Sequence, residues 1–319
     1  MATVSLSADT HPDITMYVIK LLTKNNIVTI LDFAQADIDR LVRITKLSPE
    51  AIRAIKSDII NRYCGNVINV IEYFRYLDGL VEPIPTSING LDALLEGGLL
   101  LGHTLEICGE SGTGKTRLCV SLAANVAQYS KFDSIYVDTK CDFSATELRR
   151  MLQQRKSSDQ ETKEIMQRIK IHHCFSLADL VDFVEELLAI VDDMKAFKVL
   201  IIDSLPSLWY MHQNSKSSCY SLGLLTRLAG SLRKLASENL ISVVIVNLAI
   251  RPTGISAENN GRKVVNQRDS YSALGRFWES VPTTRLLTSK IEENKIVISI
   301  WKSNYLKKIG QQITITNNY

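Results

Sequence analysis

A glycine-rich segment that ends in Lys-Thr has the clearest capacity for chemistry in this 319-residue sequence. It fits the spacing G-x-x-x-x-G-K-[ST], in which a loop between a strand and a helix surrounds the phosphates of a nucleotide. Glycines let backbone N–H groups converge on an anion, and the positive end of the following helix favours negative charge. The lysine is expected to reach the β- and γ-phosphates, and the threonine hydroxyl to ligate Mg²⁺. The predicted nucleotide-binding residues are Gly109, Glu110, Ser111, Gly112, Thr113, Gly114, Lys115 and Thr116.

An aspartate at the end of an apolar run is the candidate for the second half of this site. Residues 198–203 read as a buried strand that ends in Asp203. In proteins with such a loop, an aspartate there holds the water shell of Mg²⁺, so Thr116 and Asp203 are the predicted metal-binding residues. The alternative for a strand-ending aspartate is a helix cap or a turn former. Asp138 is a weaker copy of the same pattern. The predicted cofactors are ATP and Mg²⁺.

The elements that must position these residues alternate between strands and helices from residue 86 onward. This alternation predicts an α/β fold, with a mostly parallel sheet flanked by helices. A helix is expected after Lys115, and another begins at Ser144 in a capping box with Glu147. A long helix is expected over residues 218–239. The predicted strands are 105–109, 134–138, 169–174, 198–203 and 241–247, followed by late strands, expected to be antiparallel, at 284–288, 295–301 and 311–316.

Residues 1–64 are predicted to form a small all-helical N-terminal domain. Isoleucines recur there at helical spacing, and Ser-Pro-Glu at residues 48–50 is a strong helix start. Residues 65–85 contain glycine and proline breaks and are predicted to be a linker, which leaves residues 86–319 as the nucleotide-binding core. The linker carries an aromatic patch at residues 73–76. The patch either anchors a partner or packs on the neighbouring domain, and the sequence leaves both open.

The composition narrows the classes of function. A net charge of +3 is too small to indicate a nucleic-acid partner by itself. Six cysteines without a C-x-x-C pair or a metal-type spacing favour reduced thiols inside a cell. No apolar run approaches the roughly 18 residues of a membrane span, and no secretory signal opens the chain, so no membrane partner is expected.

The combined motifs resemble the RecA-like recombinases, specifically their eukaryotic strand-exchange branch and its paralogues. The N-terminal helices are similar to that branch's N-terminal domain, and its D-type paralogues have a similar Leu-Gly-Arg-x-Trp segment. The resemblance implies a RecA-type P-loop NTPase core acting in homologous-recombination repair in the nucleus, on single-stranded DNA and with related paralogue subunits. Besides the phosphate loop, the matching segments are 86–98, 102–109, 118–126, 136–139, 200–204, 273–278 and 281–286.

Three departures from the family pattern bear on activity. Active members carry a Glu after the Asp-Thr of the second strand, where it activates the attacking water; here Lys140 stands in that position, and an ammonium cannot accept the proton. Glu147 is a poor substitute because the capping box explains it, so no catalytic residue is predicted. The Gln that follows the fifth-strand Asn is Leu248, which cannot hydrogen-bond a γ-phosphate. Residues 65–85 lack a Phe-x-x-Ala polymerisation motif, which favours a hetero-oligomer over a homo-filament.

The resemblance places two DNA-facing loops at about residues 211–220 and 251–272. The second is cationic and suited to phosphates of single-stranded nucleic acid, although a solvated loop of mixed charge is the alternative. Arg285 is interpreted as structural rather than catalytic. Two functions remain: a weak DNA-stimulated ATPase, or a non-hydrolysing subunit in which ATP stabilises an interface. An unrelated P-loop kinase is disfavoured because no acceptor-substrate site is evident. The predicted DNA-binding residues are Arg251, Arg262, Lys263 and Arg268.

Overall fold

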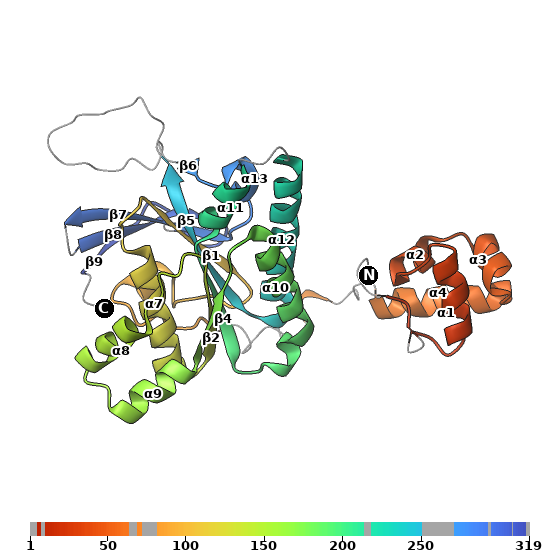
Figure 1. Cartoon of the computed structure of the whole chain (residues 1–319), viewed down its shortest axis with the longest axis horizontal. Coiled ribbons are helices and arrows are strands. Elements are labelled where there is room, and N and C mark those ends of the chain that lie inside the picture. Colours follow the sequence, from red (N-terminus) through yellow and green to blue (C-terminus); the bar gives the residue numbers. More distant parts are fainter. Residues whose placement is uncertain are drawn as a thin grey trace. The chain divides into compact units, whose positions relative to one another are not determined.

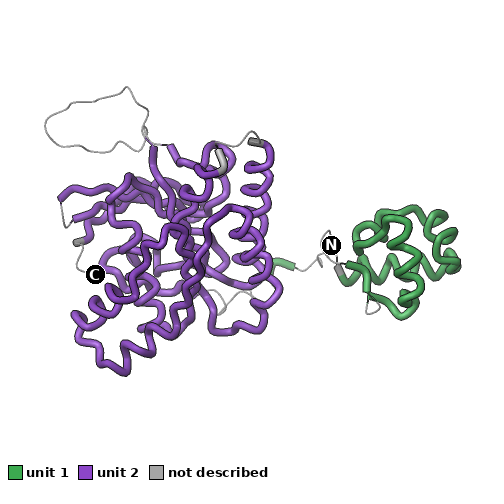
Figure 2. Tube along the Cα trace, viewed as in Figure 1, with its two compact units in different colours: residues 1–78 green, residues 79–319 purple. Residues whose placement is uncertain are grey.

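The computed structural model of the chain divides into two compact units, residues 1–78 and 79–319 (Figures 1 and 2). The predicted aromatic patch at residues 73–76 lies outside the described residues, as does most of the predicted linker, so that part of the domain scheme stays a prediction. The structure describes residues 5–7, 10–63, 69–71, 82–213, 218–250, 271–292, 295–307 and 309–316.

The first unit consists of short helices around an apolar core of its own. The described helices are α1 (Met16–Lys24), α2 (Ile30–Gln35), α3 (Ile38–Thr45) and α4 (Pro49–Tyr63). The start of α2 is fixed by a capping box between Thr29 and Asp32, and the Ser48 hydroxyl accepts from the Ala51 N–H at the start of α4. Ile52, Ile55 and Ile59 of α4 lie in the core, together with apolar side chains of the other three helices, whereas Ile60 is exposed.

The second unit is built on a mixed sheet in the order β3-β2-β4-β5-β1-β7-β8-β9, with β6 paired to β5 (Figure 1). The strands from β3 to β7 in this order are parallel, and β8 and β9 are antiparallel. The bounds are β1 (Thr104–Gly109), β2 (Asp133–Asp138), β3 (Ile169–His173), β4 (Phe197–Asp203), β5 (Ser242–Ile250), β6 (Tyr271–Ser272), β7 (Thr284–Glu292), β8 (Lys295–Ser303) and β9 (Gln312–Thr316).

The expectation that all the late strands are antiparallel is wrong for β7, which pairs in parallel with β1. The chain crosses from the end of β5 back to the start of β1 before β7 begins. Thr283 fixes this start, because its N–H and its hydroxyl both donate to the Thr104 carbonyl, at 3.0 and 2.7 Å. The pairs β7–β8 and β8–β9 that follow are antiparallel, as is the short β5–β6 pair.

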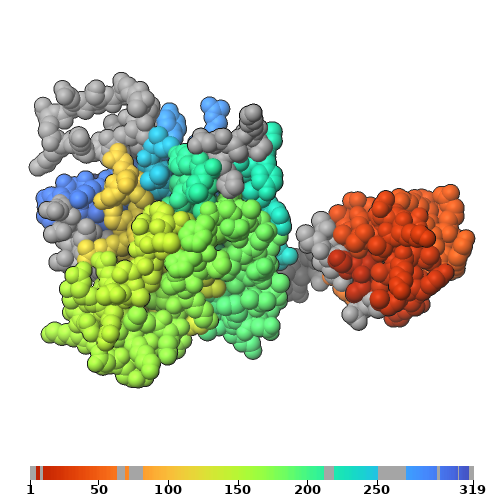
Figure 3. Space-filling model, in the orientation of Figure 1, coloured from red at the N-terminus to blue at the C-terminus, as the bar shows by residue number. Residues whose placement is uncertain are grey.

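Helices cover both faces of the sheet because alternate residues of the central strands are apolar on both sides. On β4, Val199 and Ile201 belong to one core cluster, and Leu200 and Ile202 to the other. The first face packs against α7 (Lys115–Asn125), α8 (Ala145–Gln154) and α9 (Asp159–Gln167), and the second against α10 (Leu177–Ile190), α11 (Leu205–Gln213) and α12 (Ser218–Asn239). In the space-filling view, the residues coloured yellow to green, which include α7 to α10, form much of the visible surface of this unit (Figure 3). The short helices are α6 (Leu91–Leu94) and α13 (Gly275–Glu279), with a π-helical turn at Val126–Ser130 and a 3₁₀ turn at Val191–Asp193.

Candidate nucleotide-binding site

The loop between β1 and α7 has the conformation that its glycines allow. Gly112 and Gly114 have φ values of 76° and 80°, in the left-handed region that favours glycine. Gly109 is needed for another reason, because a Cβ there would lie 2.1 Å from the Thr288 hydroxyl oxygen. The Thr113 hydroxyl donates to the Glu110 carbonyl at 2.9 Å and closes the loop. Glycine therefore serves both the turn and the close approach of β7.

Lys115 begins α7 with its ammonium folded over the loop. Its Nζ donates to the carbonyl oxygens of Gly109 and Glu110, at 2.9 and 2.6 Å. Burial lowers the pKa of Lys115 to about 8, against the opposing effect of the Asp203 carboxylate. The Asp203 carboxylate offsets only part of the cost of burying this positive charge, so the site favours an incoming anion. This is the electrostatic condition for phosphate binding at the start of a helix.

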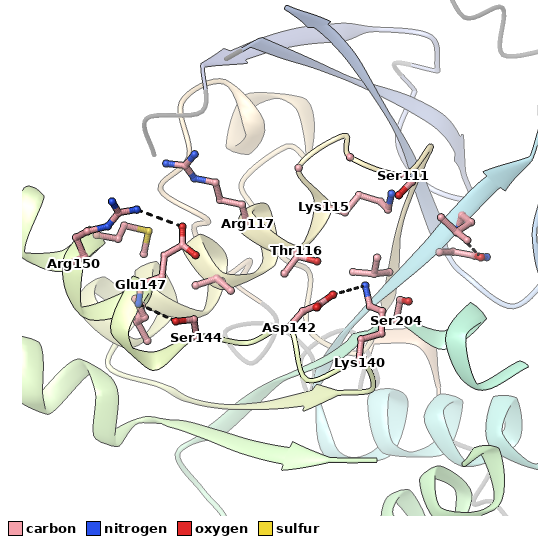
Figure 4. Close-up of a pocket in the computed structure, with 18 of the residues that line it drawn as sticks. Ser111, Lys115, Thr116, Arg117, Lys140, Asp142, Ser144, Glu147, Arg150 and Ser204 are labelled. Carbon is pink, nitrogen blue, oxygen red and sulfur yellow. Dashed lines mark hydrogen bonds and ion pairs between the residues drawn. The ribbon is translucent and has the colours of Figure 1, made fainter. Parts of the chain in front are cut away.

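The loop opens onto a cavity of about 440 Å³ (Figure 4). Of the eight predicted loop residues, Gly109, Glu110 and Thr113 build the loop without lining the cavity. Side chains from other elements complete the wall, including Lys140 and Asp142 after β2, and Leu248 on β5. The loop residues that line it are Ser111, Gly112, Gly114, Lys115 and Thr116.

Asp203 ends β4 beside this cavity, nearly enclosed by protein at 1% exposure. The Tyr136 hydroxyl donates to its Oδ2 at 2.8 Å. Its Oδ1 receives no hydrogen bond from the residues that the structure describes. A carboxylate oxygen without a hydrogen bond and the Thr116 hydroxyl fit the oxygen-ligand chemistry of Mg²⁺, which keeps several waters and takes few protein ligands. Bound Mg²⁺ would neutralise charge on the phosphates of the nucleotide. Among the described residues there is no group of three or more His, Cys, Asp or Glu side chains that could hold a metal ion.

Asp138 is a loop former rather than a second metal ligand. Its carboxylate accepts from the backbone N–H groups of Lys140, Asp142 and Phe143, at 3.1, 3.3 and 2.9 Å. These bonds fix the turn after β2, which is the alternative that sequence reasoning allows for an aspartate at a strand end.

Lys140 extends from this turn into the cavity. Its Nζ lies 3.3 Å from Asp142 Oδ2 and 3.6 Å from Asp203 Oδ1. Figure 4 shows its side chain directed into the cavity, with the Asp142 contact drawn as a dashed line. The residue in the place of the expected catalytic glutamate is therefore an ion-pair partner of the candidate metal-binding aspartate.

The capping box predicted at Ser144 is only half formed. The Ser144 hydroxyl accepts from the Glu147 N–H at 3.2 Å. The Glu147 carboxylate pairs with Arg150 at 3.6 Å instead of returning to the start of the helix (Figure 4). Both side chains are largely exposed. They lie three residues apart on α8, a spacing that places two side chains next to each other on the helix surface.

A buried polar network supports the β1–β5–β7 part of the sheet. The fully buried Glu106 accepts from Asn247 Nδ2 at 2.6 Å and from Trp278 Nε1 at 2.7 Å. Arg285 donates to its other oxygen and stacks over the Trp301 ring, with 5.4 Å between the guanidinium carbon and the ring centroid. These contacts agree with a structural role for Arg285. Sequence reasoning missed Glu106, although a lone charge inside an apolar strand is a signal of such a network.

Leu248 lines the cavity directly after this network. Its N–H is bonded to the side chain of Asn247 at 2.7 Å, and Asn247 also donates to Ser272 on β6 at 2.7 Å. The side chain that would face a terminal phosphate is therefore apolar. The predicted DNA-binding residues that follow β5 lie outside the described residues, namely Arg251, Arg262, Lys263 and Arg268.

The fold and the loop geometry together define a RecA-type nucleotide-binding domain, preceded by a helical unit. Residues 80–318 match the family profile described as Rad51. The chain belongs to the Rad51 family, whose members are RecA-like ATPases. Among the helices of the described residues, none is long and apolar enough to cross a membrane.

Relatives in animals match almost end to end. The chain is 29% identical to the mouse "DNA repair protein RAD51 homolog 4" over 314 residues, which cover 97% of this chain and 92% of that protein. It is 27% identical to the bovine protein of the same name, covering 91% of this chain and 86% of that protein. The human "DNA repair protein RAD51 homolog 2" is 25% identical, covering 88% and 80%.

Proposed function

We propose that this protein is an ATP-binding paralogue that assists homologous-recombination DNA repair in the nucleus, as one subunit of a complex with related proteins. Membership of the Rad51 family and the printed names of its relatives support the repair role. The single observation that carries nucleotide binding is the placement of Lys115 and Thr116 on a closed glycine loop that lines a cavity of about 440 Å³. Residues 109–116 hold the phosphates, and Thr116 and Asp203 support Mg²⁺.

Hydrolysis by this chain is slow, with single-stranded DNA as the proposed stimulus. Lys140 cannot accept a proton from an attacking water, and Leu248 cannot hydrogen-bond a terminal phosphate. The DNA contact is assigned to the segment that contains Arg251, Arg262, Lys263 and Arg268, because clustered cationic side chains suit the phosphates of single-stranded DNA.

A structural subunit is the second candidate function, and the ion pair between Lys140 and Asp203 favours it. In this function ATP binds preferentially to the assembled complex and stabilises it by mass action, without turnover. The two functions differ in one requirement, since only the enzyme needs ATP to be hydrolysed.

The test is radiolabelled ATP binding and single-turnover hydrolysis by the purified chain, with and without single-stranded DNA. Slow turnover that DNA accelerates supports the enzyme. Binding without turnover, together with assembly supported equally by a non-hydrolysable ATP analogue, supports the structural subunit. Lys115→Ala is expected to abolish binding in both cases. Wild-type chain that binds no ATP, alone or with related subunits, contradicts the proposed function.

A further inference from the structure

The Lys140 ammonium is a positive charge of the protein itself, and it lies beside the expected binding place of phosphate and metal. It faces two carboxylates, Asp142 and Asp203, and lines the same cavity as Lys115 and Thr116 (Figure 4). Its side chain is 36% exposed and lines the cavity, so a ligand there can contact it. The two lysines thus bring positive charge to the cavity from separate elements, the phosphate loop and the turn after β2.

The turn that carries Lys140 is held from several sides. The carboxylate of Asp138 fixes the backbone N–H groups of the turn, as described above. Thr139 is bonded to the residue directly after β4, because its hydroxyl donates to the Ser204 carbonyl at 2.9 Å and accepts from the Ser204 N–H at 2.8 Å. Register pairing also sets Asp138 directly beside Asp203. The position of Lys140 over Asp203 is therefore built by both strands.

Asp203 needs this positive charge. A carboxylate at 1% exposure carries a large desolvation cost unless it is paired. The Tyr136 hydroxyl donates a hydrogen bond to Asp203 Oδ2. Asp203 Oδ1 forms the ion pair with Lys140 and receives no hydrogen bond from the described residues. A divalent ion that uses this carboxylate must share it with an ammonium, and like charges at such separations repel. Lys140 therefore weakens the attraction of the Asp203 carboxylate for Mg²⁺, and it also brings a positive charge to the cavity where a phosphate would bind.

We propose that Lys140 is a built-in cation of the phosphate site, which lets this protein bind ATP with little dependence on Mg²⁺. The inference rests on the proposed nucleotide binding. Lys115 and Lys140 together neutralise negative charge on the phosphates of ATP. In a site with an acidic residue in place of Lys140, a bound metal ion would have to supply that part of the positive charge. Lys140 is therefore a specificity-determining residue for the form of nucleotide that binds.

The test is the ATP dissociation constant of the purified full chain, measured by titration calorimetry with Mg²⁺ and, separately, with EDTA. The two values for the wild type are expected to agree within about threefold. Lys140→Met is expected to weaken binding in EDTA by about tenfold or more, the loss typical of a hydrogen bond to a charged group, with a smaller change in Mg²⁺. Lys140→Arg keeps the charge and is expected to retain metal-free binding.

Lys163→Met is the matched control, since Lys163 is an exposed lysine on α9 that does not line the cavity. It is expected to reproduce both wild-type constants. Wild-type binding that is lost in EDTA, or a Lys140→Met variant with the wild-type ratio of constants, overturns the inference but leaves ATP binding intact. Absence of ATP binding under both conditions contradicts the proposed function itself, and the inference falls with it.

Discussion

At the residue scale, burial of the charged Lys115 ammonium costs the folded protein free energy, and a bound anion can offset that cost. Only 8% of the residue is exposed, and burial lowers its pKa to about 8 from the ordinary 10.5. Between these two values the unfolded chain binds more protons than the folded chain, so folding stability rises with pH through this window. Below pH 8 the charged ammonium costs the folded state up to about 3 kcal/mol. An anion in the cavity removes much of that cost.

Lys115→Met is therefore expected to stabilise the nucleotide-free fold at pH 7 by up to about 3 kcal/mol, because an apolar side chain has no charge to desolvate. The gain should shrink as the pH rises from 8 to 10.5, where the wild-type lysine becomes neutral in the folded state first. Chemical denaturation of both proteins across this range measures it. A stability difference that does not vary with pH would contradict the shifted pKa.

Lys140→Glu introduces the acidic residue that the family resemblance leads us to expect at this position. It is expected to raise single-turnover ATP hydrolysis by about tenfold or more, because general-base assistance contributes roughly 10²–10⁴-fold in enzymes. Lys140→Gln is the control, since it removes the ammonium without adding a base. If Lys140→Glu hydrolyses ATP no faster than Lys140→Gln, the missing base does not limit the reaction.

At the scale of elements, the phosphate loop depends on how closely β7 approaches the end of β1. Gly109→Ala is expected to destabilise the protein, because its Cβ would lie 2.1 Å from Thr288 Oγ1 and 2.6 Å from the Thr288 carbonyl oxygen. Gly230→Ala is the matched control on the exposed side of α12, where a Cβ meets nothing within 4 Å. It should stabilise the helix by about 1 kcal/mol. Thermal unfolding compares the two, and equal effects would contradict the tight approach.

The β1–β7 pair is also joined by the buried ion pair of Glu106 and Arg285, which are register partners. Arg285→Met leaves the Glu106 carboxylate buried without its counter-ion and is expected to cost about 3–5 kcal/mol in the free energy of unfolding. The double variant Glu106→Met/Arg285→Met should recover part of this loss, because it removes the unpaired charge. Denaturant unfolding measures both. A double variant less stable than Arg285→Met would contradict this account of the pair.

At the scale of the whole molecule, each unit has an apolar core drawn only from its own residues. A fragment of residues 79–319 is therefore expected to fold and to bind ATP with the affinity of the full chain. Calorimetric titration of the fragment and of the chain measures this. The circular dichroism spectrum of the 79–319 fragment separates a folding failure from a binding failure, and a fragment of residues 1–78 should show a helical spectrum of its own. Loss of ATP binding by a folded 79–319 fragment would show that the first unit contributes to the site.

The sequence alone determined the parts of this protein whose signal is local. Residues 109–116 could be assigned from spacing because a phosphate loop needs glycine angles and a lysine at fixed positions. The α/β alternation and the helix over residues 218–239 followed from periodicity, and α12 spans those residues. The replacement of the expected glutamate by Lys140 was evident from the motif, but its contacts were not.

Only the tertiary structure decided what distant strands bring together. Asp138 and Asp203 become neighbours through the β2–β4 register, which places Lys140 over the Asp203 carboxylate. Glu106 meets Arg285 because β7 returns in parallel beside β1, against the antiparallel expectation. Strand pairing is a non-local choice, set by packing of whole faces and by crossover connections rather than by any residue's own preference. The phosphate loop could therefore be predicted from local sequence, whereas the charged residues around it are brought together by strand pairing in the sheet.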